Sequence, residues 1–144
     1  MAYYYITLAF AIKTHDYIIE QSGGLPGIND IGLLESILNH MQNDMYYPEF
    51  EDKLTHLVYS VNKNHAFRDG NKRSSIALGA YFLEINGLDY CVDKFIIEME
   101  NIAVHVADNR IDKVLLHEIV CSLIFESEYS EALKLKLIEA LYSE

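Results

Sequence analysis

Residues 64–83 read NHAFRDGNKRSSIALGAYFL, and this stretch decides the fold. The window from Lys63 to Arg73 holds four of the eleven basic residues of a chain with a net charge of -11, and its one acidic residue is Asp69. The segment Ser75–Leu83 that follows is apolar almost all round. A helix without a polar face is usually covered by its neighbours. We therefore predict a central buried helix that is entered directly from a positively charged loop.

Length, charge and cysteine content narrow the classes of protein. A chain of 144 residues is most simply one domain, long enough to bury roughly 70% of the surface of its unfolded form. A pI near 4.8 argues against a protein that coats nucleic acid, which needs many Lys and Arg side chains. Cys91 and Cys121 lack metal-ligand spacing and suit ordinary thiols of a reducing compartment. No apolar run approaches the roughly eighteen residues of a membrane span. We expect a soluble, cytoplasmic protein without a membrane or nucleic-acid partner.

Helical periodicity dominates the rest of the chain. Apolar residues recur at the i, i+3, i+4, i+7 spacing of an amphipathic helix in three segments. These are Leu34 with Ile37, Leu38 and Met41; Leu54 with Leu57, Val58 and Val61; and Leu116 with Ile119, Val120 and Leu123. Asn29 or Asp30 is expected to cap the first of these helices and Asp112 the last, because short oxygen side chains accept from free backbone N–H groups. The pattern predicts an all-α fold.

Two segments interrupt this pattern. Gly23–Gly27 (GGLPG) cannot continue a helix and predicts a turn or loop. Residues 43–52 (NDMYYPEFED) allow two interpretations. One is a surface loop with aromatic anchors. The other is an exposed flap, such as one short β-hairpin, where Tyr46 and Tyr47 would dock a target protein.

The chain after the buried helix shows weaker signals. Asn86 and Gly87 are expected to end that helix, and residues 88–92 to form a short extended piece before another helix from Asp93. Residues 127–144 have an amphipathic helical pattern that extends the domain. This last helix is expected to complete the core or to form an oligomer contact.

The loop from His65 to Gly70 enters the N-terminus of the predicted buried helix. Backbone N–H groups there have no intrahelical partner, and the helix dipole adds partial positive charge, so this end favours an anion. Gly70 allows close approach, while Lys72 and Arg73 add full charges beside the Asn71 amide. These residues predict a phosphate cradle.

Two further residues of the loop indicate chemistry. A carboxylate such as Asp69 beside bound phosphates is how Mg²⁺ is usually held. His65 is the one side chain of the window whose chemical type accepts a proton near neutral pH. Simpler interpretations are a surface histidine, an aspartate that caps the helix, and a solvated face for Lys72 and Arg73. The combination of these residues favours a site, with Phe67 turned into the core.

The stretch His65-x-Phe67-x-Asp69-Gly70-Asn71-Lys72-Arg73 resembles the signature of the Fic/Doc family. SGGLPGINDIGLLESIL (residues 22–38) and FLEINGLDY (residues 82–90) resemble the Doc branch, the "death on curing" toxins. The likeness covers residues 5 to about 125. It implies an all-helical, single-domain Fic/Doc fold over residues 1–126, with residues 127–144 as a C-terminal helical extension of the same domain.

The resemblance also implies transfer of a phosphorus-containing group from a nucleoside triphosphate, ATP or another, to a Ser, Thr or Tyr hydroxyl of a target protein. His65 would deprotonate the hydroxyl and Asp69 would hold Mg²⁺. The residues implied to bind the nucleotide are Arg68, Gly70, Asn71, Lys72 and Arg73, of which Asn71, Lys72 and Arg73 also belong to the implied catalytic set together with His65 and Asp69.

Lys72 bears on which group is transferred. Adenylyltransferases of the family have glycine there and transfer AMP, whereas the Doc branch has Lys-Arg and is associated with γ-phosphoryl transfer to a translation elongation factor. A lysine fills space and adds a charge where phosphates lie. The resemblance thus favours a kinase of a toxin–antitoxin pair; AMP transfer and a non-catalytic binding module are the alternatives.

Regulation and a rival enzyme class complete the predictions. Doc proteins are restrained by a separate antitoxin, other family members by a helix carrying Ser/Thr-x-x-x-Glu. Glu126 and Glu131 have a serine at the required spacing, although neither is followed by the expected Gly or Asn.

A metal phosphohydrolase that uses His15 and Asp16 would need an earlier histidine that the sequence lacks. The oligomeric state is not predicted.

Overall fold

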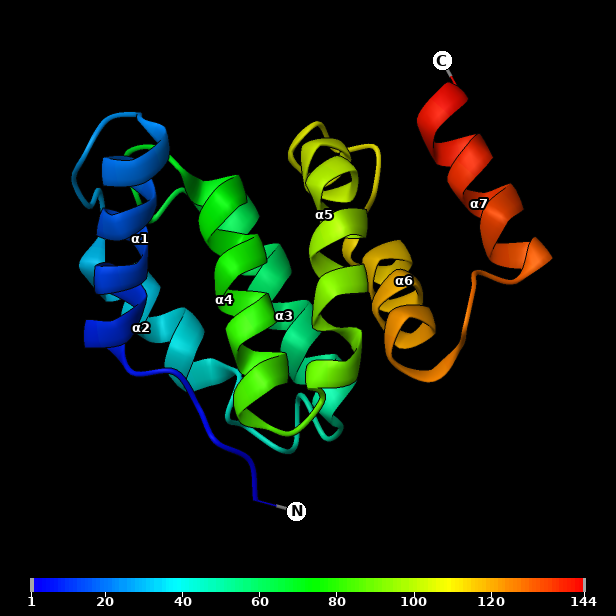
Figure 1. Ribbon diagram of the computed structural model, residues 1–144, viewed down its shortest axis with the longest axis horizontal. Helices are drawn as coiled ribbons and strands as arrows, with labels where there is room; N and C mark the ends of the chain where they lie inside the picture. The colour runs from blue at the N-terminus through cyan, green and yellow to red at the C-terminus, as the bar shows by residue number, and fades with distance from the viewer. Residues whose placement is uncertain (1, 144) are drawn as a thin grey trace.

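The computed structural model describes residues 2–143, which form a bundle of seven α-helices (Figure 1). They are α1 (Leu8–Ser22), α2 (Ile31–His40), α3 (Phe50–Lys63), α4 (Asn71–Ile85), α5 (Val92–Ala107), α6 (Lys113–Phe125) and α7 (Glu131–Tyr142). A 3-10 turn, η1 (Asp89–Cys91), precedes α5. In this described part of the chain, no helix combines the length and the apolar character needed to cross a membrane. The prediction of an all-α fold is confirmed.

Helix α4 is the centre of the bundle, with α1, α3 and α5 packed around it (Figure 1). Leu78 and Phe82 are fully buried there. Gly79 allows α3 and α5 to pack closely on α4, because a Cβ atom at this position would lie 2.7 Å from Phe95 Cζ and 2.8 Å from Val58 Cγ2. The apolar run after the charged window is therefore the buried central helix that the sequence predicts.

The predicted helix caps are also present. Asp30 accepts a hydrogen bond from the backbone N–H of Leu33 (2.9 Å), and Asp112 accepts one from Leu115 (2.8 Å). Each carboxylate satisfies one of the N–H groups that the first turn of a helix leaves free. These caps fix where α2 and α6 begin.

Residues 43–49 fold into turns, and no strand forms within residues 2–143. The β-hairpin flap that the sequence left open is therefore absent, and the segment is the surface loop of the first interpretation. The Asn43 side chain accepts from the backbone N–H groups of Met45 (2.9 Å) and Tyr46 (3.2 Å). Lys53 of α3, fully buried, donates to Asp44 (2.7 Å). These local bonds hold the backbone in turns rather than in a strand pair.

The connection between α4 and α5 is more helical than predicted. Asn86 ends α4 as expected, and the Leu88 N–H bonds the Leu83 carbonyl (2.9 Å). Cys91 then donates its N–H to Leu88 (3.3 Å) and closes η1. The expected extended piece at residues 88–92 is wrong, because these backbone bonds turn the chain directly into α5. Cys91 and Cys121 are both free thiols.

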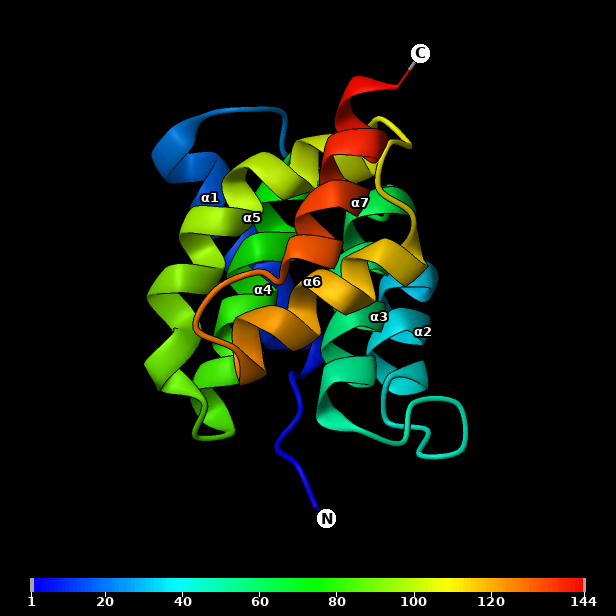
Figure 2. The ribbon, with the colours of Figure 1, turned by 90° about the vertical axis from the view of Figure 1, so that its right-hand side faces the viewer.

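Helix α7 packs on α6 and stands apart from the rest of the bundle (Figures 1 and 2). Leu133 is buried, whereas Leu135, Ile138 and Tyr142 are exposed. Arg110 ties the end of α7 to the α5–α6 loop through the carbonyl of Leu141 (3.2 Å). This loose packing suits an addition to the domain; the boundary at residue 126 stays a prediction.

Candidate active site

The loop His65–Gly70 joins α3 to α4 at one end of the bundle (Figure 1). His65 (φ 53°) and Gly70 (φ 77°) both have left-handed backbone conformations. Glycine adopts this conformation freely, but for other residues it persists only where the surroundings hold it, at a cost of about 1–3 kcal/mol. The loop therefore needs support from outside.

The segment after the glycine-rich loop supplies that support. Residues 27–30 lie antiparallel to residues 66–68 through one isolated bridge. The Asn29 N–H donates to Ala66 O (2.8 Å), and the Asn29 side chain donates to His65 O (3.2 Å). Asn29 is thus a brace that holds the His65 backbone, and not the helix cap that was one of its predicted roles.

Asn71 braces the loop from the other side. Its Oδ1 accepts from the backbone N–H of Phe67 (3.2 Å), and its Nδ2 donates to the Phe67 carbonyl (2.9 Å). Asn71 is only 8% exposed, and the Phe67 side chain is buried in the core as predicted. Because both ends of the Asn71 amide are used by the backbone, this side chain sets the shape of the loop. Its contact with a phosphate stays a prediction.

The carboxylate of Asp69 is held by backbone N–H groups. Oδ2 accepts from Leu25 (2.9 Å), and Oδ1 accepts from Gly70 (2.8 Å). These two bonds, with the nearby charges of Arg73 and Lys72, lower the pKa of Asp69 below its usual value. The carboxylate is therefore ionised at neutral pH, with lone pairs left on both oxygens.

The guanidinium of Arg73 is bound to the end of α1. Nη1 donates to Ser22 Oγ (2.7 Å) and to Gly23 O (2.8 Å). Gly24 lies so close that a Cβ atom there would be 2.7 Å from Asp69 Oδ2 and 3.0 Å from Arg73 Nη2. The glycine-rich loop therefore wraps both charged side chains. Only a residue without a side chain fits at Gly24, which also has a φ of 121°.

His15 of α1 is a residue of this site that the sequence did not assign to it. Its ring is fully buried, lies parallel to the Phe67 ring at 3.8 Å between centroids, and its Nε2 is 2.7 Å from Asp69 O. Since a carbonyl oxygen only accepts, Nε2 carries the proton in this bond. The available signal was its spacing of four residues from Ala11, also fully buried, which places His15 on the core face of α1.

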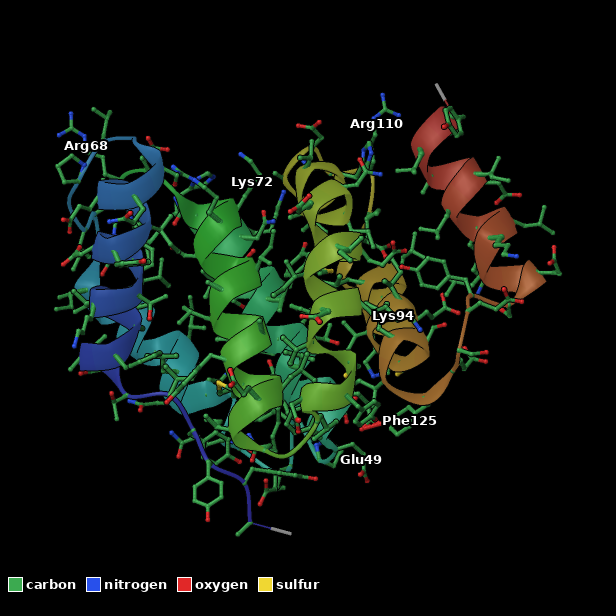
Figure 3. All side chains as sticks on the ribbon, viewed as in Figure 1. Glu49, Arg68, Lys72, Lys94, Arg110 and Phe125 are labelled. Atoms are coloured by element: carbon green, nitrogen blue, oxygen red, sulfur yellow. The ribbon has the colours of Figure 1, made fainter. Side chains whose placement is uncertain are left out.

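The remaining side chains open onto a pocket of about 430 Å³ at the N-terminus of α4. His65, Arg68 and Lys72 are exposed at its wall, with Asp69 half-buried between them. Figure 3 shows Lys72 at the end of α4 and Arg68 on the motif loop. Among residues 2–143, neither cation forms an ion pair. With the free N–H groups of the helix end, this wall can bind an anion.

The pocket fits a magnesium ion only in part through protein ligands. Over residues 2–143, no cluster of three or more His, Cys, Asp or Glu side chains could hold a metal. Mg²⁺ commonly binds through one or two carboxylates together with substrate phosphates and water. The ionised, exposed side of Asp69 suits such a single ligand.

Four of the predicted residues lie away from this pocket. Tyr46 is 70% exposed on the 43–49 loop, and Tyr47 stacks on His56 at 4.3 Å between ring centroids. Glu126 directly follows α6, at the opposite end of the bundle from Lys72; Phe125 marks this position in Figure 3. Glu131 begins α7. Arg73 donates to Ser22 and Gly23, and neither glutamate is paired with it in the structure.

The chain is similar to known proteins over its N-terminal part. The sequence model described as Fic/DOC family matches residues 5–83, which include α1 to most of α4. The chain is 38% identical over 81 residues to "Protein kinase doc" of Escherichia phage P1, covering 54% of this chain and 64% of that protein. It is 35% identical over 94 residues to "Toxin Doc" of Mycolicibacterium smegmatis (strain ATCC 700084 / mc(2)155), covering 62% of this chain and 72% of that protein.

The chain thus spans about two thirds of the length of the curated relatives it matches. The matched part contains every residue of the motif loop and both segments that brace it. The family model covers more than half of the 144 residues. By this match, and by the helical fold around the motif loop, the chain belongs to the Fic/DOC family.

Proposed function

We propose that this protein transfers the γ-phosphoryl group of ATP to a hydroxyl group of a target protein. The observation that carries the proposal is the pocket in which His65, Asp69 and Lys72 meet at the N-terminus of α4. A relative that shares this part of the chain is named a protein kinase. Phosphoryl transfer depends mainly on positioning and on charge stabilisation, which this wall of the pocket offers.

The reaction needs a base for the target hydroxyl. The hydroxyl oxygen forms a bond to the γ-phosphorus while the bond from that phosphorus to the β–γ bridging oxygen breaks, and ADP leaves. The hydroxyl proton passes to an imidazole nitrogen of His65, which is exposed to an incoming protein. The bracing by Asn29 keeps this backbone in place without a cost at each turnover.

The other residues bind and orient the phosphates. Asp69 would hold a Mg²⁺ ion that neutralises charge on the phosphates and aligns them. Lys72 and Arg68 supply cations that no carboxylate of the described chain neutralises. Arg73 acts through the loop, since its Nη1 is engaged with Ser22 and Gly23. Asn71 and Gly70 shape the loop at the point where the phosphates approach.

The names of the relatives support a proposal for the target and the regulator. One of them is named a toxin, so we propose that the modified protein is essential, with a translation elongation factor as the first candidate and a Ser, Thr or Tyr hydroxyl as the acceptor. A separate antitoxin protein would then restrain the activity. An inhibitory contact from Glu126 or Glu131 is the second proposal, and it requires that the chain after α6 moves from its place in the structure. Glu126→Ala, and deletion of residues 127–144 for Glu131, test it through a rise in activity.

The test compares two positions of the label. The protein is incubated with Mg²⁺, purified elongation factor and ATP that carries ³²P at either the α- or the γ-phosphorus. We expect γ-label alone to appear on the target. Label from the α-position would instead show AMP transfer, the alternative that Lys72 disfavours.

A variant of the base provides the control. In His65→Asn, the new asparagine tolerates the left-handed backbone conformation at this position, so the loop keeps its shape. We expect it to lower transfer by at least about 100-fold, as loss of a general base does. Equal labelling by wild type and His65→Asn would overturn the assignment of the base. No transfer of either label by wild type would leave a binding module as the function.

A further inference from the structure

A second pocket, of about 300 Å³, lies between α3, α6 and the 43–49 loop. Figure 2 faces this side of the molecule, where the first turns of α6 cross in front of α3. Lys113, at the start of α6, forms one wall, and Tyr47 forms another. Neither residue belongs to the motif loop or its braces, so the pocket is separate from the candidate active site.

Lys113 is a cation without a counterion. Its ammonium lies 5.1 Å from the ring centroid of Tyr47 and 5.9 Å from that of Tyr59, and its Nζ is 3.1 Å from His56 Nδ1. Among the residues that the structure describes, no carboxylate pairs with it. Burial lowers the pKa of Lys113, as expected for an ammonium that is partly desolvated and not neutralised.

The one carboxylate at this pocket is already engaged. Asp52 accepts from His117 Nε2 through Oδ1 (2.7 Å) and from the backbone N–H of Glu49 through Oδ2 (3.0 Å). Both bonds hold it to the start of α3 and away from Lys113. The positive charge of the pocket therefore remains available to an outside anion.

The rim of the pocket carries apolar side chains, and the pocket has more volume than a single small anion fills. Two of the residues that line it are strongly exposed: Val114 is 73% exposed and Tyr46 is 70% exposed. Single exposed apolar residues are ordinary, but two that line one pocket with a partly desolvated cation have the composition of a protein interface: apolar contacts beside a charge. In a chain with a net charge of -11, this cation would select one carboxylate at short range rather than attract a polyanion.

We propose that this pocket binds an acidic side chain of a partner protein, with Lys113 pairing with the carboxylate while Tyr46 and Val114 contact the apolar residues beside it. A carboxylate of the partner would pair with the Lys113 ammonium, which already lies over the Tyr47 ring but has no negative charge beside it. The surface is independent of the transfer reaction, so the proposal holds whichever group the active site transfers.

Two blocked tripeptides test it: acetyl-Leu-Glu-Leu-amide and its glutamine counterpart. The readout is the NMR signal of the Val114 methyl groups and of the Lys113 side chain in ¹³C-labelled protein. We expect saturable shifts at both residues with the glutamate peptide in the millimolar range and at least about tenfold weaker binding of the glutamine peptide. Equal affinity for the two peptides, or no saturable shift, would overturn the proposal.

Two variants locate the binding. Lys113→Met keeps the side-chain stem that packs against Tyr47, so the fold is expected to survive, yet the Val114 shift should be lost. Lys72→Met removes a cation of the other pocket and should leave the shift unchanged. Loss of the shift in Lys72→Met alone would place the peptide at the active site and contradict the proposal. A dimer of the wild type that Lys113→Met dissolves would assign the surface to a second copy and contradict it as well.

Discussion

The motif loop and the Lys113 pocket differ in how their polar groups are satisfied. At the motif loop, Asp69 is held by two backbone N–H groups and Arg73 by a hydroxyl and a carbonyl. At the other pocket, the Lys113 ammonium has no carboxylate, and the buried Nε2 of His56 has no hydrogen-bond partner within residues 2–143. The groups that shape the motif loop are thus satisfied by the chain itself, whereas the partly buried cation of the other pocket has no counterion.

The comparison suggests what each site needs. A transfer reaction benefits from groups that are already in place, because reorganisation during turnover is costly. A docking site can keep an uncompensated charge, which is stabilised only when the partner arrives. The two arrangements can be separated by variants that alter one of them at a time.

The largest effect is expected from Gly24→Ala. The new Cβ would lie 2.7 Å from Asp69 Oδ2, at a φ of 121° that L residues rarely adopt. We expect the free energy of unfolding to fall by about 3 kcal/mol, from strain and clash together. Phosphoryl transfer should fall further, since Asp69 and Arg73 must move. Urea denaturation and the γ-label assay measure the two effects.

Gly23→Ala is the matched control for that substitution. Gly23 has a φ of 86°, but nothing lies within 4 Å of the position of its Cβ. The change carries backbone strain alone, about 1–2 kcal/mol, and should leave transfer by the folded protein largely intact. If both variants lose transfer equally, the close contact between Gly24 and Asp69 does not account for the loss of transfer in Gly24→Ala.

A smaller loss of stability is expected from His15→Leu. The substitution leaves the Asp69 carbonyl without its donor and removes the ring that stacks on Phe67. An unsatisfied buried acceptor and the lost stacking should together lower the free energy of unfolding by about 2 kcal/mol. His15→Gln, which can donate from a similar position, should recover part of it. Equal losses in both variants would mean that the hydrogen bond contributes little.

Much of this site could be predicted from the sequence, but not its braces. The period of the apolar residues and the unbroken run at Ser75–Leu83 predict the buried helix, and the motif residues follow one another along the chain. Asn29 and His15 contact the loop from 36 and 54 residues away, so no local pattern links them to it. The turn at residues 43–49 was ambiguous because Tyr46 and Tyr47 have strand propensity, which the Asn43 bonds override.

The free energy of unfolding should depend on pH through His56, which lies beside the Lys113 pocket. Burial, together with the nearby charges of Lys113 and His40, lowers the pKa of His56 to about 4 from 6.5. Below pH 6.5, His56 takes up a proton in the unfolded chain but stays neutral in the folded protein. The free energy of unfolding therefore falls as the pH drops toward 4. At pH 5.5 this amounts to about 1.5 kcal/mol relative to pH 8.

His56→Phe isolates this contribution. A phenyl ring can stack on Tyr47 in the same place but cannot titrate. We expect urea denaturation at pH 8 and pH 5.5 to show a smaller loss for His56→Phe than for wild type, by about that 1.5 kcal/mol. If the two proteins lose stability equally, the acid sensitivity comes from other groups.

The sharpest contrast is expected between two lysines, Lys53 of α3 and Lys113 of α6, and the second of them should give the smallest effect of all. Lys53 is fully buried and donates to Asp44 and to the carbonyl of Met41. Burial alone would lower the pKa of Lys53, but the bond to Asp44 raises it above the usual value. Lys53→Met should therefore lose about 1–2 kcal/mol of stability, because the carbonyl of Met41 is left without its donor.

Lys113→Met should change the free energy of unfolding by less than about 1 kcal/mol, and in the direction of greater stability. The ammonium that it removes has been partly desolvated without the compensation of a carboxylate, whereas the methionine stem keeps its packing against Tyr47. A lysine that does not stabilise the fold is consistent with one that binds a partner. A loss as large as that of Lys53→Met would instead make Lys113 a structural residue, and the difference between the two regions would then disappear.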